Sequence, residues 1–215
     1  MNLIVFDIDD TLTESAELHQ KFFVECLNAF GSAKKDYDFS SYKHHTDSFI
    51  FREIYTSDID LNYTKGKLVE FESMMMRKFR VVNVSEIPSS VTFIDTVTKN
   101  ENYGLCFATG SLQKPAEYKL ESLGIDYRNT VLSCSNCNES REGIVKEAIL
   151  KSKLKYDVEF FEKITVFGDG IWDLKTAENL SLDFYGIGKK NKRLLLDNGC
   201  KSHSDDFVGV TLEGL

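Results

Sequence analysis

Short apolar runs recur along the chain, and each has about the length of a β-strand. The runs are rich in β-branched or aromatic residues and are continuous rather than alternating, which is typical of strands buried on both faces of a parallel sheet. The five predicted strands are Leu3–Phe6, Tyr103–Ala108, Thr130–Ser133, Ile164–Phe167 and Phe184–Ile187. Turns follow these runs and helix-like segments separate them, so the pattern predicts an α/β fold with a central parallel sheet between layers of helices.

A long segment between the first two predicted strands reads as mostly helical. Apolar residues recur there at helical spacing in three stretches. They are Leu18, Phe22, Cys26, Leu27 and Phe30, then Phe49, Ile50, Ile54 and Tyr55, and finally Leu68, Phe71, Met75 and Phe79. We therefore expect residues 14–88 to form a small helical cap domain, inserted after the first strand of a core domain made of residues 1–13 and 89–215.

Composition and charge narrow the class of protein. The chain has 215 residues, 42% hydrophobic and 28% charged, which fits one folded domain with an insertion and excludes a disordered chain. A formal net charge of −8 argues against nucleic acid or an anionic membrane as the main partner. No apolar run approaches the roughly 20 residues that span a bilayer, and the acidic start does not resemble a signal peptide. We expect a cytoplasmic protein, either a monomer or a homodimer.

Five cysteines are present, and an odd number without a secretion signal favours reduced thiols. Cys134 and Cys137 form a single CxxC, which cannot complete a tetrahedral zinc site by itself. The same spacing also suits redox chemistry, so a redox pair is the alternative to two ordinary loop thiols.

Carboxylates follow the first predicted strand directly, at Asp7, Asp9 and Asp10. Open α/β sheets bind ligands at the carboxyl ends of their strands. Acids clustered at such a place repel one another unless a cation neutralises them, and hard oxygen ligands suit Mg²⁺. The alternative is an acidic turn in which Asp10 or Thr11 caps a helix.

Two further predicted strands end in polar residues. Asp169 and Asp173 follow one of them in a Gly-Asp-Gly turn, although Asp173 could simply cap the next helix. The other ends at Thr109 and Ser111, whose hydroxyls and backbone amides could hold phosphate oxygens. Two acid-tipped strands in one sheet favour a metal site over two unrelated turns.

Together these motifs resemble the haloacid dehalogenase-like hydrolase superfamily. The order along the chain is DxDxT after the first strand, a helical insertion, a strand-borne Thr or Ser, a basic residue and then GDxxxD. The resemblance covers nearly the whole chain, and the insertion and the tail at Tyr185–Gly188 are similar to the phosphoglycolate phosphatase-like branch. It implies a Rossmann-like three-layer sandwich with a helical cap, and hydrolysis of a phosphate ester with Mg²⁺.

The resemblance assigns roles to individual residues. Asp7 is implied to be the nucleophile that forms an aspartyl-phosphate, and Asp9 the general acid and base. Thr109 would hydrogen-bond the transferring phosphoryl group. Asp7, the backbone carbonyl of Asp9, and Asp169 would hold the magnesium ion, with Asp173 supporting it.

The basic residue of the third motif has two candidates. Aligning Ile144 and Val145 with the usual apolar pair places Arg141 where relatives have a lysine, and Lys146 is the alternative. We prefer Arg141, because a side chain at a helix start can reach into the site and a guanidinium offers phosphate a bidentate fork. A surface arginine without a role in the site is the competing interpretation.

Asp9 also favours one reaction type, because halide displacement from carbon needs no proton for its leaving group and dehalogenases of this superfamily lack this acid. We therefore expect a phosphatase acting on a small phosphorylated metabolite. A phosphomutase acting on a sugar phosphate, or a binding protein that has lost turnover, are the alternatives.

Polar residues of the predicted cap are candidates for contacting the leaving group, with ordinary structural roles as the alternative. They are His19, His44, His45, Thr46, Asp47 and Arg52. We expect Trp172 to pack beneath the GDxxxD loop rather than against a substrate. Two residues stand where relatives often have glycine, namely Asp10 in the first motif and Ser181 at a helix end.

Overall fold

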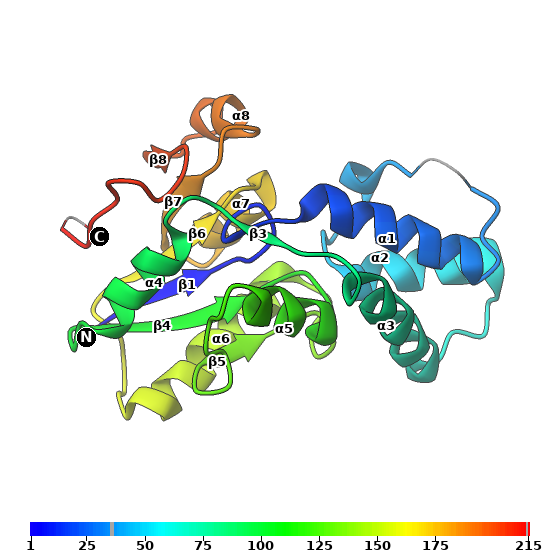
Figure 1. The fold of residues 1–215 in the computed structure, drawn as a ribbon, viewed down its shortest axis with the longest axis horizontal. Helices are drawn as coiled ribbons and strands as arrows, with labels where there is room; N and C mark the ends of the chain where they lie inside the picture. The colour runs from blue at the N-terminus through cyan, green and yellow to red at the C-terminus, as the bar shows by residue number, and fades with distance from the viewer. Residues whose placement is uncertain (35–36, 214) are drawn as a thin grey trace.

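Six β-strands form one sheet in the computed structural model, which describes residues 1–34, 37–213 and 215. The strands are β1 (Asn2–Phe6), β4 (Tyr103–Ala108), β5 (Val131–Ser133), β6 (Ile164–Gly168), β7 (Asp183–Ile187) and β8 (Ser202–Ser204). Their order across the sheet is β5-β4-β1-β6-β7-β8, and every neighbouring pair is parallel (Figure 1). Along the polypeptide, β4 and β5 are added on one side of β1, and β6, β7 and β8 are then added on its other side.

The five strands predicted from the apolar runs are all present, each within one residue at either end. The expectation of five strands is nevertheless wrong by one, because β8 extends the sheet beyond β7. Its three residues are Ser-His-Ser, and none of them is fully buried. A strand at the edge of a sheet can be short and polar, so no apolar run marks it in the sequence.

Helices cover both faces of the sheet, which confirms the predicted three-layer arrangement. They include α4 (Ser90–Thr98) on one face, and α6 (Arg141–Tyr156) and α7 (Ile171–Asn179) on the other. Successive residues of β1 point to opposite faces. Ile4 and Phe6 pack in the hydrophobic cluster beneath α4, whereas Leu3 and Val5 pack in the cluster beneath α6 and α7.

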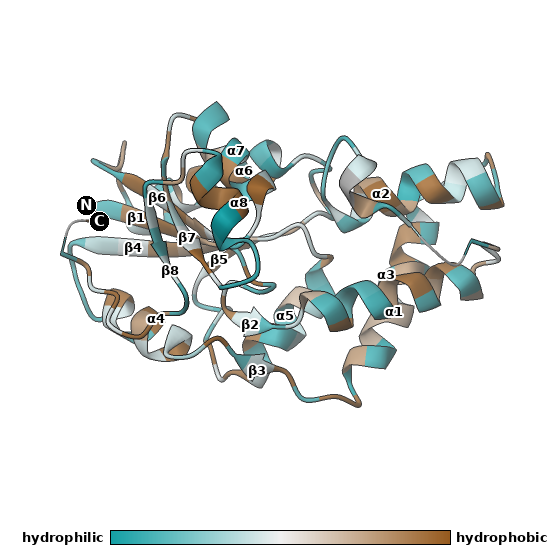
Figure 2. Ribbon diagram, turned by 90° about the horizontal axis from the view of Figure 1, so that it is seen from above, coloured by the Kyte–Doolittle hydropathy of each residue, from teal (hydrophilic) through white to brown (hydrophobic). Residues whose placement is uncertain are grey.

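Three further helices lie away from the sheet and surround a hydrophobic cluster of their own (Figures 1 and 2). They are α1 (Ala16–Ala29), α2 (Asp47–Ile54) and α3 (Lys65–Phe79), with a short 3₁₀ helix at Phe39–Ser41 and a π-helical turn at Tyr55–Ile59. The rings of Phe51 and Phe71 stack at its centre, 4.2 Å apart. All three predicted helical stretches are confirmed. We call α1, α2 and α3, together with the described segments that connect them, the helical lobe.

The chain leaves the sheet for the helical lobe and returns from it through two adjacent segments. These are β2 (Thr13–Glu14) and β3 (Ser85–Glu86), which pair in antiparallel fashion. Their positions lie close to the predicted boundaries of the insertion, at residues 14 and 88. A single two-stranded connection suits a segment that moves relative to the sheet, and the division into two domains stays a prediction.

Two more helices complete the fold, α5 (Gln113–Ser122) and α8 (Lys192–Asp197). Ala116 and Leu120 of α5 belong to the cluster beneath α4, while the same helix also packs against α3 of the lobe. Helix α5 therefore joins the sheet to the helical lobe. Among the described residues, no helix is both long and apolar enough to cross a membrane.

The aromatic side chain that precedes the first motif should contribute strongly to stability. Phe6 is fully buried and lies 5.3 Å from the ring of Phe167 on the neighbouring strand. We predict that Phe6→Ala lowers the free energy of unfolding by about 3–5 kcal/mol, through lost burial and the cavity left behind. Urea unfolding measures this change. The matched control is Phe160→Ala, because Phe160 is 68% exposed, and its effect should stay within about 0.5 kcal/mol.

Candidate active site

The three strands at the centre of the sheet end side by side. Phe6 of β1 is in register with Phe107 of β4 and with Phe167 of β6. The polar residues that follow these strands therefore come to the same edge, among them Asp7 and Asp169. The chain continues from β1 toward one edge of the sheet and from β6 toward the other, so the topological switch point lies between these two strands. Open α/β sheets form their ligand crevice at such a point.

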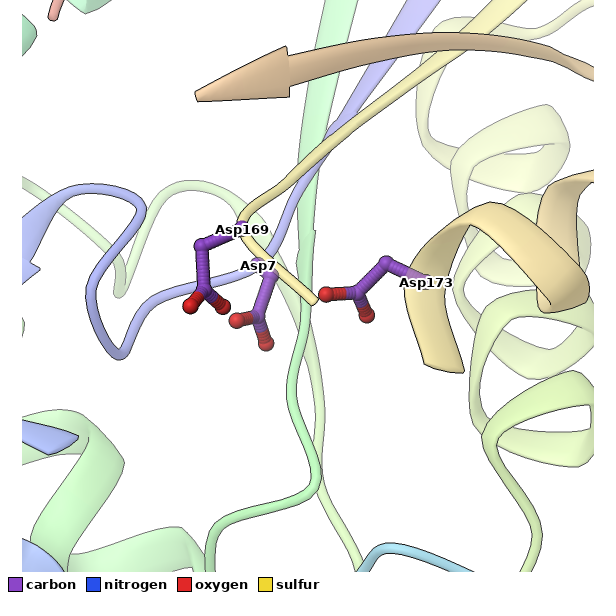
Figure 3. A group of neighbouring side chains, drawn as sticks. All are labelled: Asp7, Asp169 and Asp173. Atoms are coloured by element: carbon purple, nitrogen blue, oxygen red, sulfur yellow. The ribbon is translucent and has the colours of Figure 1, made fainter. Parts of the chain in front are cut away.

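Three carboxylates converge at this edge. Asp7, Asp169 and Asp173 are buried, and one oxygen of each lies within 4.8 Å of the others (Figure 3). In Figure 3, Asp7 lies between the other two. Burial raises the pKa of Asp7 to about 7, helped by the neighbouring charge of Asp173 and opposed by Arg141. Burial, together with Asp173 and Asp7, raises the pKa of Asp169 well above its ordinary value.

Arg141 provides the positive charge next to this cluster. It is the first residue of α6, where Ser140 caps the helix by accepting a hydrogen bond from the Gly143 amide. Its Nη2 donates to Asp173 Oδ1 and lies 3.2 Å from Asp7 Oδ1. Of the two cations considered from the sequence, Arg141 is buried at the site and Lys146 is exposed on α6.

The residues present fit a divalent cation. Asp7 Oδ1 is buried and accepts no hydrogen bond from any described residue, although Arg141 is near it. Asp173 is held on both oxygens, by Arg141 at Oδ1 and by the Gly170 amide at Oδ2, 3.2 Å away. Three buried carboxylates beside one guanidinium leave an excess of two negative charges, and carboxylate oxygens are the ligands that Mg²⁺ prefers. Compared with Asp173, Asp7 and Asp169 therefore have carboxylate oxygens that are more available to bind a cation.

The carboxylate of Asp9 lies outside this cluster and has a different set of partners. Lys119 Nζ donates to both of its oxygens, at 2.6 and 2.7 Å. Ser15 Oγ donates to Oδ1 at 2.5 Å, and Ser111 Oγ donates to Oδ2 at 2.6 Å. Burial by itself would raise the pKa of Asp9, but the charge of Lys119 and the hydrogen bonds from Lys119 and Ser111 outweigh it and hold the pKa well below the ordinary range. The ionised form is therefore favoured.

Sequence reasoning missed Lys119. The residue lies in a helix with the sequence QKPAEYKLES, which has the polar composition of a surface helix. The available signal is its position, because residue 119 follows Ala116 by three and precedes Leu120, and both of these are buried. A lysine on the apolar face of a helix is a candidate for a buried charge.

The turn after β4 completes the sheet side of the site. Thr109 is buried, its amide donates to the Ser133 carbonyl at 3.0 Å, and its Oγ1 accepts from the Ser111 amide at 3.1 Å. Both Thr109 and Ser111 line the same cavity as Asp7 and Asp169. The predicted residues Asp7, Asp9, Thr109, Arg141 and Asp169 thus face one space, and Asp173 stands behind it.

This cavity has a volume of about 270 Å³ and lies between the sheet edge and the helical lobe. Four of the six predicted cap residues line it, namely His19, His45, Thr46 and Asp47. The lobe also contributes an apolar wall, formed by Phe23, Phe39 and Ile50.

The remaining two predicted cap residues are not at the cavity. Arg52 forms a two-pronged ion pair with Glu139 of the core, with both N–O distances 2.9 Å. His44 instead packs edge-on against the ring of Phe49. Arg52 therefore links the helical lobe to the core through this ion pair. Neither Arg52 nor His44 lies where it could contact a leaving group in the cavity.

Trp172 differs from expectation in part. Its ring stacks on the imidazole of His45 at 3.9 Å and with an interplanar angle of 10°, and both residues line the cavity. The expected packing against the GDxxxD loop is present, because the ring lies against Gly170. The stack on His45 and the place on the cavity wall were not expected; they arise because Trp172 lies in the first turn of α7, where that helix meets the lobe. Burial and the charge of Arg141 lower the pKa of His45 to about 4, so this stack holds a neutral imidazole near neutral pH.

The two positions where relatives have glycine both adopt left-handed backbone. Asp10 has φ of +52° and Ser181 has φ of +55°. Glycine is favoured there because it adopts this conformation without strain, and aspartate tolerates it better than most residues. The side chain of Asp10 accepts the amides of Ser15 and Ala16 at 3.2 and 2.9 Å, so it caps the start of α1 rather than joining the carboxylate cluster.

Comparison with known proteins gives consistent matches. The model of the haloacid dehalogenase-like hydrolase family matches residues 1–180. No curated protein sequence matches the chain. Among solved structures, CbbY from Rhodobacter sphaeroides in complex with phosphate has a TM-score of 0.76 at 18% identity, covering 99% of this chain and 98% of that one.

Two other solved structures show the same fold. β-Phosphoglucomutase from Clostridium difficile has a TM-score of 0.70 at 16% identity, over 98% of this chain and 93% of that one. A HAD hydrolase of family IA, variant 3, from Entamoeba histolytica has a TM-score of 0.69 at 19% identity, over 99% and 96%. At these identities the likeness establishes the fold and not the substrate.

The raised pKa of Asp7 predicts a pH-dependent stability in the absence of metal. Between about pH 4 and pH 7 the folded protein keeps a proton on Asp7 that the unfolded chain has lost, so the free energy of unfolding falls as pH rises through this range. In EDTA at pH 8, Asp7→Asn should therefore melt about 3–6 °C above the wild type, which corresponds to roughly 1–2 kcal/mol. At pH 5 the difference should shrink.

Thermal melting monitored by circular dichroism measures this difference. Glu159→Gln changes the net charge equally at an exposed position and is the control, with an expected shift below about 1 °C. A wild type as stable as Asp7→Asn at pH 8 in EDTA would contradict the proposed electrostatic conflict.

Proposed function

Because the chain belongs to the haloacid dehalogenase-like hydrolases, we propose that it is a Mg²⁺-dependent phosphatase that hydrolyses a small phosphorylated metabolite through an aspartyl-phosphate on Asp7. One observation carries the proposal. Asp7, a buried carboxylate with an oxygen that accepts no hydrogen bond from the described residues, shares a cavity with Asp9, Thr109, Arg141 and Asp169. In the proposed reaction Asp7 is the nucleophile and Asp9 carries the proton. Thr109 donates a hydrogen bond to the phosphoryl group, Arg141 provides positive charge, and Asp169 helps to hold the metal ion.

In the first half of the reaction, an oxygen of Asp7 attacks phosphorus and the bond from phosphorus to the leaving oxygen breaks. Asp9, which must first take up a proton from solvent because its ionised form is favoured, gives that proton to the leaving oxygen, and the alcohol departs. Thr109 lies at the end of the neighbouring strand and would hydrogen-bond the transferring group. Arg141 would offset the charge of the phosphoryl oxygens while keeping Asp173 in place.

In the second half, water attacks the phosphorus of the aspartyl-phosphate and passes a proton to Asp9. The bond between phosphorus and the Asp7 oxygen breaks, which releases inorganic phosphate and restores the Asp7 carboxylate. The ionised Asp9 of the structure, held by Lys119, Ser15 and Ser111, is the form that this half-reaction requires.

A bound magnesium ion would reduce the repulsion between the Asp7 carboxylate and the phosphate and would stabilise charge on the phosphoryl oxygens. We assign its protein ligands to Asp7, Asp169 and the backbone carbonyl of Asp9, since the Asp9 side chain is bound elsewhere. Asp173 supports this arrangement from behind through Arg141 and the Gly170 amide.

The cavity limits the substrate. A volume of about 270 Å³ must hold the phosphoryl group and the leaving group together, which favours a small metabolite. The wall formed by Phe23, Phe39 and Ile50 would contact the part of the leaving group that is far from phosphorus.

The acidic charge of the chain and its five free cysteines suit a cytoplasmic enzyme without a nucleic-acid or membrane partner.

The central test is release of phosphate from a panel of phosphorylated metabolites and from p-nitrophenyl phosphate. We predict turnover with Mg²⁺, none in excess EDTA, and a loss of at least about 10³-fold for Asp7→Asn, because no nucleophile remains. Glu159→Gln should keep wild-type rates. A phosphomutase would instead move phosphate between sugar phosphates without releasing it, and absence of any Mg²⁺-dependent product would contradict both readings.

The two candidate cations of the third motif allow a matched comparison. We predict that Arg141→Gln lowers kcat/KM by about 10²-fold or more, because it removes a buried charge beside Asp7 and Asp173. Lys146→Gln removes an equal charge from an exposed position of the same helix, and its kcat/KM should stay within about twofold. Equal losses for the two variants would show that Arg141 has no special role.

A further inference from the structure

Lys119 is a fully buried cation that the proposed chemistry uses only as a partner of the Asp9 carboxylate. Its side chain is 0% exposed, and burial of an unpaired ammonium would be strongly destabilising. Every donor of the ammonium is matched to an acceptor: the two oxygens of Asp9, Ser111 Oγ at 3.1 Å and His19 Nδ1 at 2.9 Å. Such complete pairing fixes the ammonium, and the groups around it, in one arrangement.

The hydrogen bond to His19 determines which of its ring nitrogens carries the proton. An ammonium can only donate, so His19 Nδ1 must accept and the proton lies on Nε2. His19 Nε2 then donates to Asp47, whose two oxygens both lie 2.9 Å away. Asp47 Oδ2 also accepts the amide of Leu112 at 2.9 Å. A continuous chain of hydrogen bonds therefore runs from Asp47 through His19 and Lys119 to Asp9.

This chain of hydrogen bonds links the helical lobe to the core. His19 lies on α1 and Asp47 on α2, and the ring of Phe79 at the end of α3 lies 5.0 Å from Lys119 Nζ. Helices α1 and α3 thus contact an ammonium that belongs to the core helix α5, and α2 is linked to it through His19. Displacing the lobe would take His19 and Phe79 away from Lys119, whereas Ser111 belongs to the core and would stay beside Asp9.

Lys119 does not face the reacting atoms. The cavity is lined by Asp9, His19 and Ser111, and these three side chains are all direct partners of Lys119, which is itself not part of the lining. The ammonium therefore acts behind the cavity wall. This placement separates it from Arg141, which lines the cavity directly.

We propose that Lys119 is a positioning residue that aims the Asp9 carboxylate and makes its aim depend on the seating of the helical lobe, through His19 and Asp47. The assignment rests on the proposed phosphatase function. This proposal has a specific consequence. Loss of the hydrogen bonds that link Asp47, His19, Lys119 and Asp9 should impair proton transfer by Asp9, and it should leave attack by Asp7 and substrate binding largely intact.

Two aryl esters of similar shape separate these effects. The leaving group of p-nitrophenyl phosphate departs as a weak base and needs little help from an acid, whereas phenyl phosphate requires a proton at its leaving oxygen. Rapid mixing with excess enzyme and Mg²⁺ measures release of either phenol in a single turnover, before the phosphoenzyme is hydrolysed.

For Lys119→Met, which keeps the length of the side chain but has no donor, we expect release from phenyl phosphate to slow about 10²-fold. Release from p-nitrophenyl phosphate should slow less than about threefold, and the KM for both esters should change little. The matched control is Lys114→Met on the same helix. Lys114 also reaches the lobe, with its Nζ 3.5 Å from Glu72, but does not touch Asp9, and both rates should stay within about twofold.

Asp47→Asn provides a second variant that changes no volume. With its carbonyl oxygen in the place of Oδ2, the amide still accepts from the His19 ring and the Leu112 amide, but its NH₂ group then faces the His19 Nε2–H in the place of Oδ1. This repulsion weakens the hydrogen-bond chain to Lys119 at its lobe end. We expect the same selective slowing of phenyl phosphate, by about tenfold. This variant decides the question if Lys119→Met does not fold.

Equal slowing of the two esters by both variants, or no slowing, would overturn the assignment of Lys119, and so would a selective effect of Lys114→Met. A wild type that releases neither phenol would instead overturn the proposed function and this assignment with it.

Discussion

Buried negative charge at one edge of the sheet is the constraint on which the rest of the site depends. Parallel strands β1 and β6 end at the same edge, so the acids that follow them are brought together in a region from which water is largely excluded. Repulsion between such groups grows as the dielectric constant falls. Each acid therefore needs a positive charge or a hydrogen-bond donor beside it. The groups that the fold places beside the individual acids differ, and so do the electrostatic surroundings of the acids.

Two buried cations make this division. Arg141 lies against Asp7 and Asp173, whereas Lys119 neutralises Asp9 and leaves it outside the cluster. Asp10, which the sequence places beside the others, turns away and caps α1. What remains is an excess of charge around Asp7 and Asp169, together with the raised pKa values that burial produces there. Asp7 and Asp9, the proposed nucleophile and the proposed proton carrier, are thus two residues apart in sequence but differ in their electrostatic surroundings.

The fold was predictable where one physical signal dominates. Strands buried on both faces require continuous apolar runs, and the helical lobe requires apolar stripes at helical spacing, so both could be predicted from the sequence. The acids at strand ends, such as Asp7 and Asp169, follow from the same logic. Strand β8 escaped because an edge strand of three polar residues carries no such signal.

The unpredicted part of the site depends on contacts between distant segments. Lys119 is 110 residues from Asp9, and Trp172 is stacked on a histidine from the helical lobe. Whether a lysine in a polar helix is buried, or which side of a loop a tryptophan takes, is determined by how the lobe seats on the core. No spacing along the chain encodes that docking, so local patterns could not reveal it.

Everything proposed for the site requires that Asp7 becomes phosphorylated. The most direct measurement is mass spectrometry of peptides from enzyme quenched in acid within milliseconds of mixing with p-nitrophenyl phosphate and Mg²⁺. The account predicts the added mass of one phosphoryl group on the peptide that contains Asp7, and its absence when EDTA replaces the metal. A phosphoryl group on another residue, or turnover without any phosphorylated peptide, would contradict it.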